Sequence, residues 1–105
     1  MPKWKKLIDI LIDTTASDAE RDDAAIDLSN YSNNEIIFAL LYTARDNNVD
    51  DMIKASCGES LAIIFITINT FRTEIYELLD GISKTEFVNY IKHNKKEWIV
   101  NLGNL

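Results

Sequence analysis

Few residues of this chain have the type and spacing that catalysis needs. The single histidine, His93, is followed by an asparagine and two lysines, and the single cysteine, Cys57, stands between small residues. A nucleophilic cysteine needs a neighbouring base or a positive field that lowers the pKa of its thiol, and neither is apparent around Cys57. We interpret His93 as a surface residue and Cys57 as a small core residue, and we predict no catalytic residues.

Metal and cofactor sites are not predicted either. One cysteine and one histidine are too few for a zinc site, and no segment has the spacing of a calcium loop. The chain has three glycines and no glycine-rich loop that could hold a phosphate. Paired acids are frequent, but among 17 acidic residues such pairs are unspecific as general acids and bases. The sequence therefore predicts no metal and no cofactor, and we interpret the chain as a non-enzyme.

The distribution of charge is more informative than these residues. Residues 9–80 carry 15 acids against four bases, a net charge of −11, whereas residues 1–8 carry three lysines and residues 81–105 a net charge of +2. An acidic field repels the phosphates of nucleic acids and attracts basic proteins at increased association rates. We therefore expect a basic protein partner and no direct contact with nucleic acid.

Eight residues are the candidate partner-binding site. For any single acid, the alternative is a solvated face or a helix cap. As a group, their common sign indicates a surface that faces a basic partner, where a tyrosine such as Tyr31 or Tyr42 could be an anchor. The candidates are Asp22, Asp23, Asp27, Tyr31, Asp46, Asp50, Asp51 and Glu59.

Helices are the elements that must position these residues. Apolar residues of 4–12 recur at spacings of three and four, which predicts an amphipathic helix. An S-x-x-E capping box at Ser17 predicts a second helix that ends near Asn30. The same pattern at Ser32 and Ser83 predicts two further helix starts. A single proline and three glycines agree with helices, because tight β-turns need more of both.

The second half of the chain is predicted to be helical with one ambiguity. The helix from Ser32 should reach about Arg45 and the next should cover 50–67, although β-branched residues make 61–68 compatible with a buried strand as well. A glycine in a helix costs about 1 kcal/mol relative to alanine, so we expect close packing to explain Gly58.

The last third is predicted less completely. A helical stripe runs from Phe71 to Gly81, and a short helix should follow from Lys84. Trp98 and the apolar residues after it fit either a continued helix or a lone extended segment, and Trp4 and Trp98 are interpreted as caps on the ends of the core.

One helical unit occurs twice, with small residues at equivalent positions 33 residues apart. A period of 30 to 40 residues with two helices in each unit is typical of stacked helical arrays. The sequence therefore predicts an all-α fold, a short stack of HEAT-like helical hairpins with about five to six helices, in one domain over 1–105. The matched residues are Arg21, Ala24, Ala25 and Leu28 with Lys54, Cys57, Gly58 and Leu61.

The cytoplasm is the expected compartment. A lone cysteine forms no intramolecular disulfide, which agrees with a reducing environment. The segment 1–13 has acids in its apolar part and no cleavage site, unlike a signal peptide, and the apolar run 61–68 is too short to cross a bilayer. We therefore expect no membrane partner.

Two segments resemble a known family. D-D-A-A-I-D-L-S-N-Y at 22–31 and C-G-E-S-L-A at 57–62 resemble the D-A-A-x-D-L-x-x-Y and C-G-E-S-(L/I)-A segments of small bacterial HEAT-repeat-like proteins. The resemblance covers about 22–65. The chain departs from the family pattern after Ala62, where 63–65 are Ile-Ile-Phe in place of the usual acid and aromatic residue. Some members of this type are immunity proteins in contact-dependent growth inhibition systems.

The resemblance implies an inhibitor that binds a toxin from a neighbouring cell and blocks its active site or substrate groove. Such toxins are often nucleases, some of the EndoU ribonuclease type, and a nuclease needs a basic groove for its RNA. The expected partner is thus a cognate, basic toxin bound by a monomer in a 1:1 complex, with Asp22, Asp27, Tyr31 and Glu59 at positions that match the family. The alternative is a HEAT-like adaptor or scaffold without a toxin partner.

Overall fold

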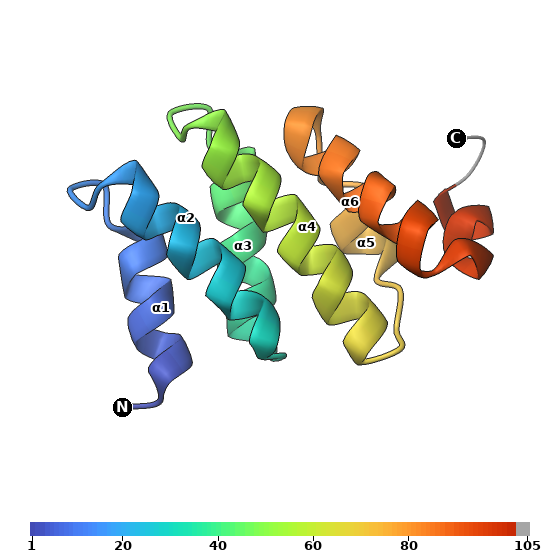
Figure 1. The fold of residues 1–105 in the computed structure, drawn as a ribbon, viewed down its shortest axis with the longest axis horizontal. Coiled ribbons are helices and arrows are strands. Elements are labelled where there is room, and N and C mark those ends of the chain that lie inside the picture. The colour runs from blue at the N-terminus through green and yellow to red at the C-terminus, as the bar shows by residue number, and fades with distance from the viewer. Residues whose placement is uncertain (103–105) are drawn as a thin grey trace.

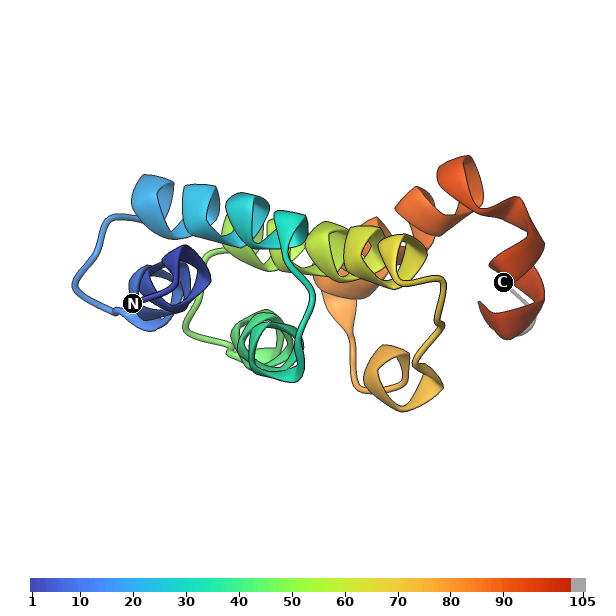
Figure 2. The same ribbon diagram turned by 90° about the horizontal axis from the view of Figure 1, so that it is seen from below.

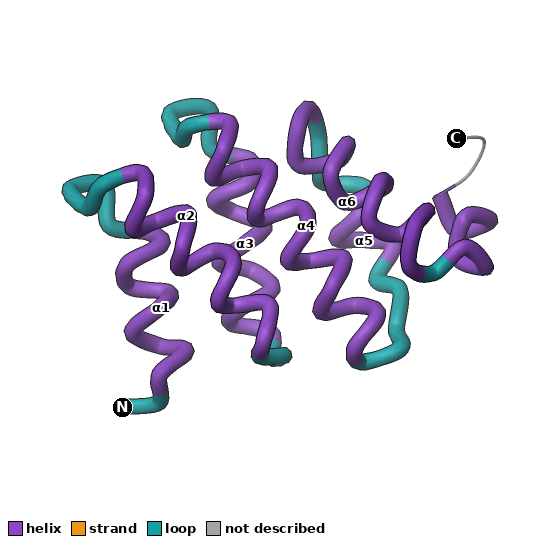
Figure 3. Tube along the Cα trace, viewed as in Figure 1, coloured by secondary structure: helices purple, strands orange, loops and turns teal. Residues whose placement is uncertain are grey.

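Six α-helices form a short stack of three helical pairs in the computed structural model, which describes residues 1–102 apart from the side chain of Asn101 (Figure 1). No strand occurs among these residues (Figure 3), so the all-α prediction is confirmed and the alternative of a strand over 61–68 is wrong. The predicted domain of 1–105 includes residues 103–105, which lie outside the described residues. The helices are α1 (Lys3–Ile12), α2 (Asp18–Asp27), α3 (Asn34–Arg45), α4 (Asp51–Thr67), α5 (Thr73–Tyr76) and α6 (Gly81–Asn94), with 3₁₀ segments η1 (Leu28–Asn30) and η2 (Lys96–Leu102).

The helices lie in two layers. One layer holds α2, α4 and α6, which run in the same direction, and the other holds α1, α3 and α5 (Figures 1 and 2). The stack extends along the longest dimension of the molecule, 39 Å, so that α1 and α2 form one end and α6 lies near the other. Because α4 contacts α2, α3 and α6, it is buried on most sides, which explains its apolar sequence.

Side-chain caps fix where the first helices begin. At the start of α2, the Oγ atom of Ser17 accepts a hydrogen bond from the Glu20 N–H at 3.1 Å and the Glu20 carboxylate accepts one from the Ser17 N–H at 3.4 Å, which confirms the predicted capping box. The predicted box at Ser32 is wrong. Asn33 caps α3 instead, since its side-chain oxygen accepts a hydrogen bond from the Ile36 N–H at 2.9 Å.

The predicted helix start at Ser83 is also wrong. The helix α6 begins at Gly81, where a φ of 52° in the left-handed region favours glycine. Ser83 is fully buried inside the helix, and its Oγ atom donates a hydrogen bond to the Asp80 carbonyl oxygen at 2.8 Å. The S-x-x-E pattern is therefore accidental at this position, because Ser83 is the third residue of α6 and its hydroxyl donates to a carbonyl oxygen instead of accepting from a backbone N–H.

The helix predicted over 71–81 is reduced to the single turn of α5. Aromatic packing holds the segment before that turn: the ring of Phe71 lies 5.5 to 6.1 Å from those of Phe65, Phe87 and Trp98. The segment η2 is a 3₁₀ helix that is separate from α6, and its Trp98 is partly buried against the core, as predicted for an end cap.

Small residues set the spacing within the α2–α4–α6 layer. A Cβ atom on Gly58 would lie 2.0 Å from the carbonyl oxygen of Ser83, so the two backbones are in direct contact and the expectation of close packing is confirmed. Ala25, 33 residues earlier, accepts a hydrogen bond at its carbonyl oxygen from the Oγ atom of Ser60 at 2.7 Å. The 33-residue repeat therefore relates two equivalent contacts: Ala25 of α2 with Ser60 of α4, and Gly58 of α4 with Ser83 of α6.

Candidate functional site

Of the two reactive side chains considered in the sequence, Cys57 lies in the core and His93 lies on the surface of α6. Cys57 is fully buried, and burial raises the pKa of its thiol to about 12, with the nearby Asp22 carboxylate adding to the rise. His93 is exposed, and its Nδ1 atom lies 2.7 Å from the carbonyl oxygen of Asn89 in the same helix. Cys57 is therefore a protonated core residue near neutral pH, as predicted. Within residues 1–102, no group of three His, Cys, Asp or Glu side chains is placed to hold a metal ion.

The helix α2 presents an acidic surface that no exposed base offsets. Asp23 and Asp27 are exposed and Asp22 is partly buried. Arg21, the one base of this helix, is buried, and its Nε atom donates a hydrogen bond to the carbonyl oxygen of Leu11 at 2.8 Å. The arginine therefore ties α2 to the end of α1, while the charged side chains of α2 that reach the solvent are all acidic.

Two of the eight candidate residues, Asp23 and Asp27, line a common groove between α1 and α2. The groove has a volume of about 220 Å³. The helices α1 and α2, which line it, form one end of the stack (Figure 1). Glu20 completes its acidic edge but was not among the candidates. The spacing of these three acids at i, i+3 and i+7 could have identified Glu20, because such residues share one face of a helix. The lining residues are Leu7, Ile10 and Ala24, which are apolar, and Glu20, Asp23 and Asp27.

Three other candidates have structural roles. Asp22 accepts a hydrogen bond from the Oγ atom of Ser56 at 2.5 Å, which joins α2 to α4. Asp46 and Asp50 each accept one from the backbone N–H two residues further on, at 2.9 and 2.8 Å, and Asp50 thereby caps α4. For these acids the simpler interpretation, a cap or a turn, accounts for the side chain.

The remaining candidates are dispersed. Asp51 is exposed in the first turn of α4. Glu59 lines a different shallow groove of about 260 Å³, together with Glu86 and His93 of α6. Tyr31 is partly buried and packs against the core, so it is not a protruding anchor, whereas Tyr42 has an exposed fraction of 71%. The structure therefore does not bring the eight residues into one site, and it brings together only the pair in the α1–α2 groove.

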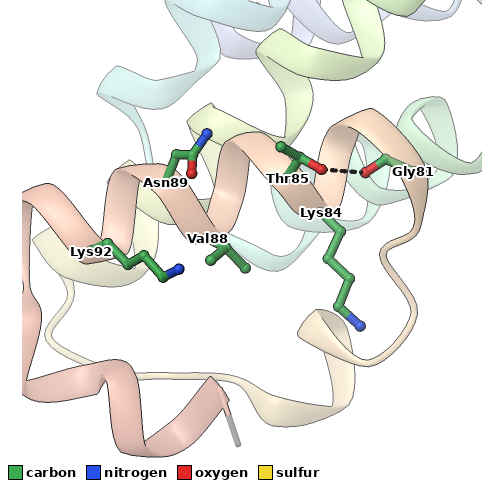
Figure 4. A pocket seen from close by; sticks show the side chains of 6 residues that line it. All are labelled: Gly81, Lys84, Thr85, Val88, Asn89 and Lys92. Carbon is green, nitrogen blue, oxygen red and sulfur yellow. Dashed lines mark hydrogen bonds between the residues drawn. The ribbon is translucent and has the colours of Figure 1, made fainter. Parts of the chain in front are cut away.

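A basic hollow, which the sequence analysis did not identify, lies against α6 (Figure 4). Its volume is about 510 Å³, and its two lysines project from the same face of the helix, with the Nζ atom of Lys84 4.7 Å from the ring centre of Tyr76. The ion pairs found in the described part of the chain, Arg72–Glu74 and Lys95–Glu97, do not include these lysines. The hollow is lined by Gly81, Lys84, Thr85, Val88, Asn89 and Lys92.

The layer of α1, α3 and α5 carries an exposed aromatic surface on α3. Phe38 and Tyr42 are one helical turn apart with ring centres at 6.5 Å, and both are exposed. The guanidinium carbon of Arg72 lies 5.9 Å from the ring centre of Phe38, and Arg45 donates a hydrogen bond to the carbonyl oxygen of Leu78 at 3.2 Å. Exposed aromatic and arginine side chains are the types that protein interfaces favour.

Comparisons with protein families, curated proteins and solved structures find no match to this chain. None of the described helices has the length and apolar character needed to cross a membrane.

Proposed function

We propose that this protein is an immunity protein, which binds a basic toxin in the cytoplasm and blocks its active site or substrate groove. The resemblance of 22–31 and 57–62 to small HEAT-repeat-like immunity proteins suggests the class, and a nuclease is the expected toxin because its groove must attract RNA. The protein acts by binding and not by catalysis.

The observation that carries this proposal is the unbalanced acidic surface of α2. Asp23 and Asp27 project beside an apolar floor of Leu7 and Ile10, while the only base of the helix, Arg21, is buried. Acids at the edge of an interface increase the rate of association with a basic partner, and apolar contacts at its centre slow dissociation. The α1–α2 groove offers both within one small surface.

The candidate acids contribute differently in this proposal. Asp23 and Asp27 contact the toxin, and Glu20 extends their row along the same face of α2. Asp22, Asp46 and Asp50 keep their hydrogen bonds inside the protein, so they add to the negative potential without contacting the toxin.

The proposal predicts a nuclease toxin encoded beside this gene, and titration of that nuclease tests it. Nuclease activity should fall linearly with added protein and reach its minimum at a 1:1 ratio, whereas the variant Asp23→Lys/Asp27→Lys should need a large excess. A matched control is Asp51→Lys/Glu77→Lys, which changes the net charge equally at exposed positions outside the groove and should inhibit nearly as well as the unmodified protein. Full nuclease activity at a twofold molar excess of the unmodified protein contradicts the proposal.

A second candidate, an adaptor without a toxin partner, is favoured by the aromatic surface of α3. Phe38 and Tyr42 are exposed residues of α3, and α3 lies in the other layer from α2 (Figure 2). If this surface binds the partner, Tyr42→Ala should abolish capture of that partner while Asp23→Lys/Asp27→Lys leaves it unchanged. The immunity proposal predicts the reverse.

A further inference from the structure

The two ends of the stack carry opposite charges around apolar or small residues. At the first end, the acids Glu20, Asp23 and Asp27 form one edge of the α1–α2 groove. Near the other end, Lys84 and Lys92 project into the hollow against α6. Figure 1 places α1 and α2 at the opposite side of the molecule from α6, so one chain cannot join its own two surfaces. We propose that the acidic end of one copy binds the basic hollow of a second copy, so that the chains associate head to tail.

The spacing of the charges supports this pairing. Glu20 and Asp27 are seven residues apart on α2, about 10.5 Å along a helix, and Lys84 and Lys92 are eight residues apart on α6, about 12 Å. Helices α2, α4 and α6 run in the same direction within their layer (Figure 1). A second copy that continues the layer places its α2 parallel to α6, with Glu20 opposite Lys84 and Asp27 opposite Lys92.

The packing between neighbouring helices of this layer supports the same contact. Inside the chain, the layer is built by small residues: Ala25 meets Ser60, and Gly58 meets Ser83. The open surface of α6 also presents small residues to the hollow, notably Gly81 and Thr85.

The groove beside α2 offers less apolar surface. Ala24 lies beside its acids but is only 2% exposed, so the apolar side chain available to a second copy is Ile10. Burial of the Ile10 side chain, now 37% exposed, adds an apolar contribution at the junction. At this end, the acids and the Ile10 side chain are therefore the features that a second copy would contact.

A second copy of the chain is the partner that we propose, because the chain itself carries both the acidic groove and the basic hollow. The two lysines of the hollow lie outside the ion pairs of the described residues, and so do the acids of the groove. Each addition in a head-to-tail contact leaves one free acidic end and one free basic end, so association continues beyond a dimer unless a ring closes. This inference does not depend on the proposed toxin, although a toxin that binds Asp23 and Asp27 would compete with the second copy.

Sedimentation velocity on the purified full chain, without any partner, tests the inference. The surfaces are small, so we expect weak association, detectable between about 10 μM and about 1 mM at low salt. The weight-average mass should rise from the 12.0 kDa monomer past the mass of a dimer as the concentration increases. High salt should suppress the rise, because the paired side chains are close to solvent.

Charge-swapped variants make the test specific to the two ends. Lys84→Glu/Lys92→Glu and Asp23→Lys/Asp27→Lys should each remain monomeric alone, and an equimolar mixture of the two should associate again because the reversed ends are complementary. Arg45→Glu/Lys54→Glu is the matched control, since it changes the net charge equally on the middle helical pair, away from both ends, and should associate more than Lys84→Glu/Lys92→Glu. Circular dichroism establishes that each variant retains its helices.

Three results would overturn the inference. A mass that stays at 12.0 kDa over the whole concentration range excludes self-association, and it leaves the hollow to an acidic ligand of another kind. A mass that levels off at a dimer indicates a closed two-fold contact. A mixture of the charge-swapped variants that remains monomeric shows that these two ends do not pair.

Discussion

Gly58 of α4 lies directly against the backbone of Ser83 in α6, so close that a Cβ atom would be 2.0 Å from the serine carbonyl oxygen. This contact joins the middle helical pair, α3 and α4, to the last pair, α5 and α6. The equivalent position one repeat earlier is Ala25. There the contact is a hydrogen bond from the Ser60 hydroxyl to the Ala25 carbonyl oxygen, and not a contact between two backbones. The distance between adjacent helices of the layer is thus set by which small residue stands at each position of the 33-residue repeat.

The variant Gly58→Ala should destabilise the fold. The new methyl group must displace α6, which should lower the free energy of unfolding by about 1–3 kcal/mol even though alanine is the better helix former by about 1 kcal/mol. Urea denaturation measures the effect. Glu59→Ala is the control, since Glu59 is an exposed neighbour on the same helix and its truncation should change stability by less than about 0.5 kcal/mol. A stabilised Gly58→Ala variant would show that the two backbones are not in contact.

The start of α3 offers a second comparison. Asn33→Ala removes the side chain that accepts a hydrogen bond from the Ile36 N–H and should cost about 1 kcal/mol of unfolding free energy. Ser32→Ala should cost much less, because Ser32 is exposed and does not cap the helix. Thermal denaturation of both variants distinguishes the two assignments. A larger loss for Ser32→Ala would restore the capping box predicted from the sequence.

The hydrogen bond from Arg21 to the Leu11 carbonyl oxygen should stabilise the first helical pair. Arg21→Met keeps the aliphatic volume and removes the charged donor, which should lower the free energy of unfolding by about 1.5–3 kcal/mol. Lys54→Met is the matched control at the equivalent position of α4, with an expected change below about 0.5 kcal/mol. Chemical denaturation at neutral pH compares them, and equal losses would mean that Arg21 has no special role.

The raised pKa of Cys57 predicts a loss of stability at alkaline pH. The folded protein holds the thiol proton up to a pKa of about 12, whereas the unfolded chain releases it near the ordinary value of 9.0. The contribution to stability is therefore complete below pH 9 and is lost as the pH rises toward 12.

Comparison with Cys57→Ala isolates this thiol. The stability of the unmodified protein minus that of the variant should fall by about 1 kcal/mol between pH 8 and pH 10. Tyr76, whose pKa burial also raises, titrates in both proteins and cancels. A difference that stays constant over this range would mean that the thiol is accessible to solvent in the folded protein.

Periodicity and repeat spacing were sufficient to predict the helical stack. The apolar stripe of 4–12 and the small residues around Gly58 depend on local spacing, which a sequence displays directly. The S-x-x-E pattern succeeded at Ser17 and failed at Ser32 and Ser83, because the pattern alone does not fix the residue at which a helix begins. Asn33 caps α3, and α6 already begins at Gly81. The helix predicted over 71–81 is shorter in the structure because Phe71 is held by aromatic rings distant in the sequence, which local spacing does not show.

The candidate site could be predicted only in part from the sequence. Net charge identified an acidic region, but a sum over residues does not show which acids are bonded internally. Asp22 and Asp50 have hydrogen-bond partners in the fold, whereas Asp23 and Asp27 share a groove. The basic hollow of α6 was hidden in a net charge of +2 spread over 25 residues, since only the helix places its lysines on one face.

The salt dependence of toxin binding tests the central claim most directly. Calorimetric titration of the neighbouring nuclease should give a Kd that weakens at least about tenfold between roughly 50 mM and 500 mM sodium chloride, because exposed charges attract the partner. The variant Asp23→Lys/Asp27→Lys should bind weakly throughout. A Kd that is the same at both salt concentrations, or unchanged in the variant, would contradict the claim that the acidic edge of α2 recognises a basic protein.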